Sequence, residues 1–218
     1  PGQDAAGNDK APDALPPGWH LVRLTDLVEL NPTYNIDSAK EIRCISLAGI
    51  SQTALAPANA LSNCRTSSPA VMFRNEDTLL PAALPDIGEG AAAFIDCLKK
   101  NELACPSADL LVMRGSKVSP EFTYCLAEDP RLREYAVFIA QRSQSDEAVD
   151  HKALANFTLP VPEPAALAMF DRIVRPVMRE MREYGRENER LFRNRERLLK
   201  HSPWVADATE KEAARSGV

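Results

Sequence analysis

The sequence predicts an α+β fold, in which a mixed globular domain is followed by a long coiled-coil helix. Two patterns lead to this prediction. Between Ile42 and Phe157, short β-like and helical segments follow one another in an irregular order, which favours a mixed domain over βαβ repeats. From Ala165 to about Lys200, apolar residues follow a heptad spacing, which is typical of a helix that packs against a second helix.

The length and composition agree with one domain and an appendage. The chain has 218 residues, of which 44% are hydrophobic and 26% are charged, and a typical domain has about 100–150 residues. Its sequence holds no apolar run of the roughly 20 residues that span a bilayer. The five cysteines are widely spaced without a C-x-x-C pair. We therefore expect reduced thiols, no metal site and a cytoplasmic location.

The chain divides into four parts. We expect residues 1–14 to form a disordered linker, 15–163 the globular domain, 164–200 the long helix and 201–218 a flexible tail. Residues 1–163 carry 14 Lys/Arg and 22 Asp/Glu, a net charge of −8, whereas residues 164–218 carry 12 and 9, a net charge of +3. An acidic domain opposes tight nonspecific DNA binding, because that affinity comes from phosphate neutralisation.

The elements are expected in the following order. The region from Leu21 to Leu30 predicts a short strand and a helical turn, closed by Asn31-Pro32. Five β-like segments come next: Arg43–Leu47, Ala70–Phe73, Thr78–Leu80, Ala92–Ile95 and Asp109–Met113. Helices are predicted at Pro120–Ala127, Pro130–Ala140 and His151–Asn156, and a strand at Phe157–Pro162.

The heptad run predicts a seam for a partner helix. Spacings of four and three residues alternate from Phe170 through Arg195 to Leu198, and Pro176 is expected to kink the helix or to mark its start. The alternative is a single helix that lies along its own domain. The residues that we assign to the dimerisation seam are Val174, Val177, Met181, Tyr184, Asn188, Leu191 and Leu198.

No catalytic motif is found in the sequence. A Gly-rich phosphate loop, G-x-S-x-G, H-E-x-x-H and an aspartate array for magnesium or calcium are all missing. We therefore predict a non-enzyme with no catalytic residue, cofactor or metal, which leaves a binding role. Phe73–Asp96 and Gln141–Glu147 are the candidate recognition segments, because the first predicts a projecting loop and the second holds Gln and Arg, which can contact base edges. The alternative for the second is an ordinary polar loop.

Five short motifs occur in a fixed order along residues 15–200. They are Leu15–Leu24 with its P-x-G-W start, Leu30-Asn31-Pro32, Glu76–Ala82, Pro120–Leu126 and Ala153–Pro162, the last leading to Arg172-Ile173-Val174 in the predicted helix. In this order they resemble the target recognition domain and long helix of type I restriction-modification specificity subunits.

The resemblance implies a non-catalytic subunit that reads one half of a bipartite DNA site. It also implies that the long helix pairs antiparallel with a second helix and docks adenine-N6 methyltransferase subunits, which bring S-adenosylmethionine; a restriction subunit joins in some assemblies. Complete specificity subunits have two domains and two helices, whereas this chain has one of each and resembles a half-subunit. A homodimer on double-stranded DNA is the expected assembly.

The candidate DNA contacts follow from this resemblance. The segment from Arg142 to Val149 corresponds to the family's G-S-x-G-x-Q-R-V loop, with acids where the family has a base and glycine, and Ala82-Ala83 stands where the family often has Arg. A scaffold that binds protein and does not read DNA is the alternative function. We predict base contacts from Arg142, Ser143, Gln144 and Ser145, and phosphate contacts from Arg65, Arg74 and Lys152.

Overall fold

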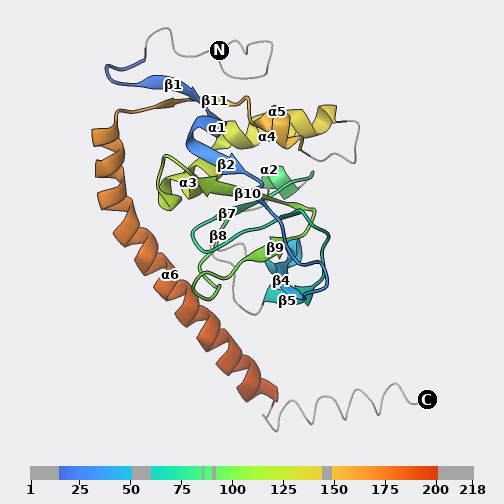
Figure 1. The fold of residues 1–218 in the computed structure, drawn as a ribbon. Helices are drawn as coiled ribbons and strands as arrows, with labels where there is room; N and C mark the ends of the chain where they lie inside the picture. Colours follow the sequence, from blue (N-terminus) through green and yellow to red (C-terminus); the bar gives the residue numbers. More distant parts are fainter. Residues whose placement is uncertain (1–14, 51–59, 85, 90–91, 144–148, 201–218) are drawn as a thin grey trace, which may run out of the picture. The chain divides into compact units, whose positions relative to one another are not determined.

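A computed structural model describes residues 15–50, 60–84, 86–89, 92–143 and 149–200 (Figure 1). The described residues up to Met178 form one compact unit, and those from Arg179 form a second. Helices and sheets are mixed in the first unit, and a long C-terminal helix follows, so the α+β prediction is confirmed. Within the described part of the chain, no helix combines the length and the apolar character needed to cross a membrane.

A four-stranded antiparallel sheet lies at the centre of the first unit. Its order is β2 (Val28–Leu30), β10 (Leu110–Gly115), β7 (Thr78–Pro81) and β8 (Ala93–Phe94). All four residues of β7 are buried. Both faces of β10 are buried as well, because Leu111 and Met113 belong to one apolar cluster and Leu110 and Val112 to another. This alternation is the period of two expected of a strand.

Three smaller sheets surround the central one. The first strand, β1 (His20–Arg23), pairs antiparallel with the last strand, β11 (Thr158–Val161). Two short strands, β3 (Thr33–Tyr34) and β6 (Ala70–Val71), form a second pair. In the third sheet, β4 (Ile42–Ile45) lies between the antiparallel β5 (Leu61–Cys64) and the parallel β9 (Ala104–Pro106), with the 3₁₀ turn η1 (Leu47–Gly49) after β4.

The helices begin where the sequence provides caps. The helices are α1 (Leu24–Leu27), α2 (Asp86–Glu89), α3 (Pro120–Ala127), α4 (Pro130–Arg142), α5 (His151–Leu154) and α6 (Pro164–Lys200). The side chains of Ser119, Asp129 and Asp150 accept a backbone N–H at the starts of α3, α4 and α5, and proline occupies the first position of α3 and α4. These groups satisfy donors that a helix start otherwise leaves unpaired.

Two differences from the predicted elements concern α2 and α6. The connection between β7 and β8 does not project as a loop over its described residues, because Ile87 of α2 is buried in the core and α2 packs against α4. Pro176 does not mark the start of the long helix, which begins at Pro164 and continues through Pro176. A proline removes one backbone hydrogen bond but does not have to end a helix that is held by tertiary contacts.

The Asn31-Pro32 motif is explained by a turn between β2 and β3. Asn31 has a φ of 48°, in the left-handed region that asparagine tolerates better than most residues. Its backbone N–H donates to the carbonyl of Val112 at 2.9 Å, and its side-chain Oδ1 accepts the N–H of Val112 at 2.9 Å. Asn31 therefore continues the pairing of β10 beyond the end of β2.

Candidate nucleic-acid interface

Arg142, the first predicted base contact, is exposed at the end of α4. Its guanidinium carbon lies 3.5 Å from the ring centroid of Phe138, one helical turn earlier. The Phe138 ring stacks on Tyr135, with 6.4 Å between centroids and 15° between planes, and the buried Tyr135 contacts Phe157 of the core. A cation over an aromatic face gains about 0.5–1 kcal/mol at an exposed site. These aromatic rings therefore hold the guanidinium at the surface.

Ser143 and Lys152 lie in the same part of the unit as Arg142. Ser143 is the C-terminal cap of α4, and its backbone N–H donates to the carbonyl of Ala140 at 3.1 Å. Lys152 is exposed in α5, which packs against α4. Gln144 and Ser145, the other two predicted base contacts, lie outside the described residues.

A surface hollow of about 360 Å³ adjoins Lys152. Two exposed groups of α5, His151 and Lys152, lie on one side of it. The complete lining is Thr25, Val28, Glu29, Leu30, Ser116, His151, Lys152 and Ala155. A phosphate near this hollow would meet Lys152 but also the carboxylate of Glu29, so the lining does not select an anion by charge alone.

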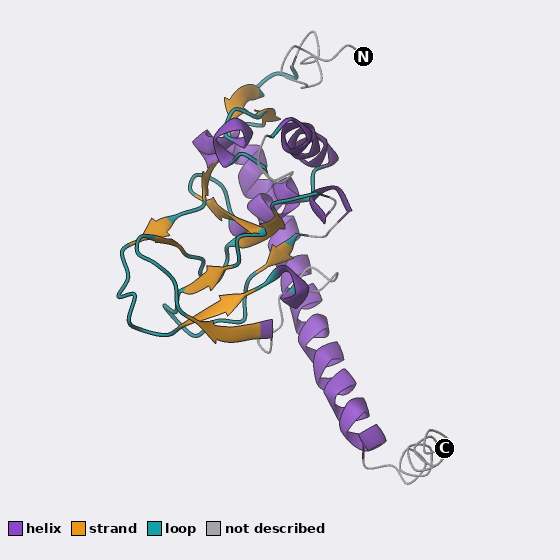
Figure 2. Ribbon diagram, turned by 90° about the vertical axis from the view of Figure 1, so that its right-hand side faces the viewer, coloured by secondary structure: helices purple, strands orange, loops and turns teal. Residues whose placement is uncertain are grey.

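Arg65 and Arg74 lie in a different part of the unit. Arg65 is exposed directly after β5, and Arg74 is exposed in the turn before β7. In Figures 1 and 2, α4 and α5 lie toward one end of this unit and the β5-β4-β9 sheet toward the other. Arg65 follows β5, and Phe73, the residue before Arg74, pairs with Ala104 of β9. Both arginines therefore adjoin this sheet, whereas the other three described candidates lie at α4 and α5.

Several arginines of the acidic domain are paired with carboxylates. Arg131 lies 2.7 Å from Asp129, Arg133 lies 2.8 Å from Glu128, and Arg43 lies 3.9 Å from Glu102. In each of these pairs a carboxylate offsets part of the charge of the arginine. The local geometry therefore reinforces the net charge of −8 in limiting nonspecific DNA affinity.

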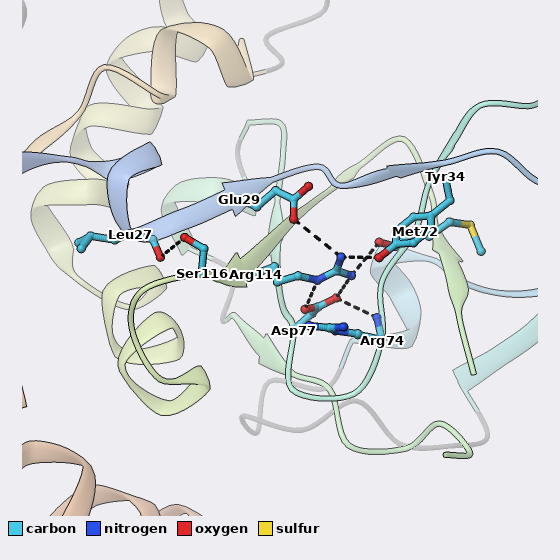
Figure 3. Close-up of polar contacts among 8 residues, drawn as sticks. All are labelled: Leu27, Glu29, Tyr34, Met72, Arg74, Asp77, Arg114 and Ser116. Carbon is cyan, nitrogen blue, oxygen red and sulfur yellow. Dashed lines mark hydrogen bonds and ion pairs between the residues drawn. The ribbon is translucent and has the colours of Figure 1, made fainter. Parts of the chain in front are cut away.

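A buried ion pair, which the sequence analysis did not predict, connects the central sheet to the turn before β7 (Figure 3). The guanidinium of Arg114 donates to Asp77 through Nε at 2.9 Å and Nη2 at 2.7 Å, and its Nη1 donates to the hydroxyl of Tyr34 at 2.7 Å. Burial lowers the pKa of Arg114, but the hydrogen bonds and charge of Asp77 outweigh it, so the pKa is raised. Asp77 also accepts the N–H of Arg74 at 2.8 Å.

This ion pair gives the Glu76-Asp77-Thr78-Leu79-Leu80 motif a structural role. Asp77 and Arg114 are 1% and 7% exposed, so neither side chain is available to DNA. The signal for this pairing in the sequence was a charged residue beside each of two apolar strands. Asp77 and Arg114 are 37 residues apart in the sequence. Helix and strand patterns identify only local neighbours, so they could not predict this ion pair.

The Pro120-Glu121-Phe122 motif lies where α3 meets the first turns of α6. Phe122 contacts Phe170 edge-to-face, with 5.4 Å between ring centroids and 77° between planes. Glu121 is 5% exposed, and its Oε2 lies 3.5 Å from Nε of Arg175. Phe170, which the heptad pattern placed on the seam, therefore packs on its own domain.

The predicted seam residues of α6 are mainly exposed. Val174 is half-buried, and Met178, which the heptad pattern left off the seam, is buried. Met169 and Ile173 are exposed apolar residues that the prediction omitted. The remaining assigned residues are all exposed: Val177, Met181, Tyr184, Asn188, Leu191 and Leu198.

No family model and no curated protein matches the chain. Solved structures do match it. A chain from a type I R-M system, in a structure that concerns complex assembly and conformational transition, is similar with a TM-score of 0.58 and 21% identity over 86% of this chain and 49% of that chain. The HsdS subunit from Thermoanaerobacter tengcongensis is similar with a TM-score of 0.57 and 20% identity over 86% and 49%.

A third match extends the comparison to another organism. The S subunit of a type I restriction-modification system from M. genitalium is similar with a TM-score of 0.50 and 12% identity over 84% of this chain and 45% of that chain. The chain thus spans about half the length of the structures that it matches. It has the fold of a type I restriction-modification specificity subunit over one mixed domain and one long helix.

Proposed function

We propose that this chain is a non-catalytic DNA-specificity half-subunit. It reads one half of a bipartite site, docks an adenine-N6 methyltransferase and pairs with a second copy through antiparallel α6 helices. The observation that carries this proposal is the combination of a specificity-subunit fold with an exposed apolar face along α6. Leucine, valine and methionine on one face of a helix lose their contact with water when a partner helix covers them.

The ordered guanidinium of Arg142 supports base reading from the α4 end of the domain. Arginine donates two parallel hydrogen bonds to the O6 and N7 atoms of guanine, which requires that its planar group be presented in a defined orientation. The contact of the guanidinium with the ring of Phe138 supports such a defined orientation. In this proposal Lys152, in the neighbouring α5, contacts a phosphate. Arg65 and Arg74 would contact phosphate only if the duplex also passed the other end of the domain.

The methyltransferase contributes both chemistry and charge in this proposal. The acidic domain of this chain and its paired arginines provide few cations for phosphate. A methyltransferase subunit on α6 would supply the missing phosphate contacts together with S-adenosylmethionine. The DNA affinity of the isolated chain is therefore expected to be weak, and the affinity of the complex strong.

The decisive experiment maps methylated adenines in DNA from cells that express this chain with the methyltransferase subunit encoded beside it. The proposal expects N6-methyladenine at a bipartite, interrupted sequence, which disappears when the chain is deleted and the methyltransferase is kept. Methylation that does not depend on the chain would refute the specificity role.

A restriction subunit is not required for this experiment, because methylation is what it measures. The proposal also includes a cytoplasmic location, since the chain must reach DNA in a bacterial-type cell.

A scaffold function is favoured by one observation, the net charge of −8 on residues 1–163. In that case the domain would bind protein, and α6 would only dimerise. A titration of the purified chain against duplex DNA, with and without the methyltransferase, separates the two functions. Sequence-specific binding by the complex supports the specificity subunit, whereas a complex that binds no DNA supports the scaffold.

A further inference from the structure

We propose that the contact between α3 and the first turns of α6 sets the spacing of the DNA site, while other residues of the domain set its sequence. We call this contact the α3–α6 clamp. It consists of Ser119, Glu121 and Phe122 at the start of α3, and Phe170, Asp171 and Arg175 in α6. The inference rests on the proposed function, in which α6 separates two reading domains.

The polar centre of the α3–α6 clamp is the hydroxyl of Ser119. Its oxygen accepts the backbone N–H of Phe122 at 3.1 Å and so caps α3. The same hydroxyl donates to Oδ1 of Asp171 at 2.5 Å. A hydroxyl has one donor and two acceptor positions, so the two bonds do not compete. The start of α3 and one side of α6 are thus held by a single atom.

The buried charge of Glu121 fixes the rotation of α6 about its own axis. A carboxylate that is 5% exposed needs a compensating charge, because water cannot reach it. Arg175 supplies that charge, with Nε at 3.5 Å from Oε2 of Glu121 and Nη2 at 3.8 Å from Oδ2 of Asp171. A rotation of α6 that moved Arg175 away would leave Glu121 unpaired in an apolar environment.

Apolar contacts hold the two helices together but specify their angle less well. Phe170 meets Phe122 edge-to-face, Val174 is half-buried and Met178 is 6% exposed. Burial of apolar surface is non-directional and tolerates small sliding movements. Hydrogen bonds weaken steeply with misalignment. Ser119 and Asp171 therefore act as positioning residues through their hydrogen bond, and Glu121 and Arg175 through the ion pair that a buried carboxylate requires.

The length of α6 decides how precisely its angle must be set to keep the distance between two DNA half-sites constant. At a rise of about 1.5 Å per residue, the 37 residues of α6 span about 55 Å. A tilt of about 3.5° at one end of a straight helix of this length moves the other end by about 3.4 Å, which is one base-pair step along DNA. An error of a few degrees at the α3–α6 clamp is thus enough to shift the site by one base pair.

The test uses the complex of the full chain and its methyltransferase on a DNA library in which the two half-sites are separated by spacers of different lengths. Arg175→Ala and Asp171→Ala are expected to keep the half-site bases. They are also expected to raise methylation at neighbouring spacer lengths, relative to the preferred one, by about fivefold, which corresponds to the loss of one polar contact of ordinary strength. Arg175→Lys keeps the positive charge near Glu121 and should restore the preferred length.

Arg172→Ala is the matched control, because Arg172 is exposed, lies on the same helix and carries the same charge. It should leave the spacer preference unchanged. If Arg175→Ala and Asp171→Ala behave like Arg172→Ala, the inference is overturned. A change in the half-site bases would also overturn it, because the contact would then affect reading itself.

A second measurement does not depend on DNA. Amide hydrogen exchange of the purified chain should be faster in peptides covering residues 164–178 of Arg175→Ala than in the wild type, with β10 unchanged as the internal reference. Unchanged exchange in residues 164–178 would overturn the inference, because it would show that Arg175 does not hold α6 on the domain. If the wild-type complex methylates no specific site, the proposed function fails, but exchange still decides whether these residues hold α6.

Discussion

At the scale of single residues, aromatic support distinguishes Arg142 from the other predicted DNA contacts. Its guanidinium lies over Phe138, whereas Lys152 extends from a short helix and Arg65 follows a strand. A side chain that is already ordered loses less conformational entropy when it binds a base edge. Base discrimination is therefore expected to depend on Arg142 more than on the other described candidates.

Arg142→Ala should relax specificity at one base pair of the half-site, at a cost of about 1–3 kcal/mol. Phe138→Leu keeps an apolar side chain but removes the ring, so it should produce the same relaxation to a smaller degree. Mapping methylated adenines with each variant measures the effect, and Arg131→Ala, an exposed arginine paired with Asp129, is the control. Unchanged base preferences in Arg142→Ala would reject its role as a reading residue.

The ion pair of Arg114 and Asp77 leads to a stability prediction. Arg114→Met leaves the buried carboxylate of Asp77 without its partner and should lower the free energy of unfolding by about 3–5 kcal/mol. The pair of Arg131 and Asp129 is half exposed on the arginine side, so Arg131→Met should cost less than about 1 kcal/mol. Urea denaturation measures both. Similar losses in the two variants would show that burial does not distinguish the pairs.

Asp129 leads to a prediction about pH. Burial raises its pKa, but the hydrogen bonds and charge of Arg131 outweigh it, so the pKa is lowered from 3.8. A carboxylate with a lowered pKa in the folded state adds stability above its unfolded pKa, and this stability is lost as the pH falls through the folded pKa. Asp129→Asn, which keeps a capping side chain, should therefore lose less stability between about pH 5 and about pH 2 than the wild type. Parallel urea curves at the two pH values test this, and equal losses would contradict it.

At the scale of elements, α6 has two apolar faces with different environments. Phe170, Val174 and Met178 face the domain, whereas Ile173 and Val177 are exposed. The heptad pattern predicted the helix, and its seam stays a prediction, but over the first turns the pattern combined the two faces. A period of 3.5 residues indicates that one side of a helix packs against another element. It does not indicate whether that element belongs to the same chain or to a partner chain.

Val177→Asp and Leu191→Asp should each convert a dimer of the chain into monomers, because a carboxylate at a covered helix position is costly to bury. Sedimentation of the purified variants measures the change. Asn194→Asp introduces the same side chain at an exposed polar position of α6 and should leave the association intact. Self-association that survives both seam changes would show that α6 pairs through another face.

Element prediction from the sequence was most successful where the signal was local. The starts of α3 and α4 at Pro120 and Pro130 were correct, because a cap and a proline at the first helical position mark a helix start.

The strands β5 and β9 were not predicted. Leu61–Cys64 shows no hydrophobic alternation, and Ala104–Pro106 has only three residues and pairs in parallel with a strand some 60 residues earlier. Their existence depends on a distant partner, β4, and not on their own pattern.

At the scale of the whole molecule, the candidate site could be predicted only in part. The resemblance of five motifs led to the correct fold. Asp77, Glu121 and Asn31 belong to those motifs, and the structure gives each of them a contact within the chain that the motifs did not indicate. The predicted phosphate contacts Arg65 and Arg74 lie in a different part of the unit from Arg142 (Figure 1). Charge and residue type identify side chains that suit DNA, but only the packing decides which of them share a surface.

The pairing of β1 with β11 has a consequence for how such a domain can be exchanged. His20 lies opposite Val161 in this pair, so the polypeptide enters and leaves the globular domain at neighbouring points. When the two ends of a domain are adjacent, a different domain whose ends lie equally close together can replace it without displacing the rest of the chain. Under the proposed function, recombination at these two junctions would give the same α6 a new reading module, and with it a new DNA target, in a single genetic step.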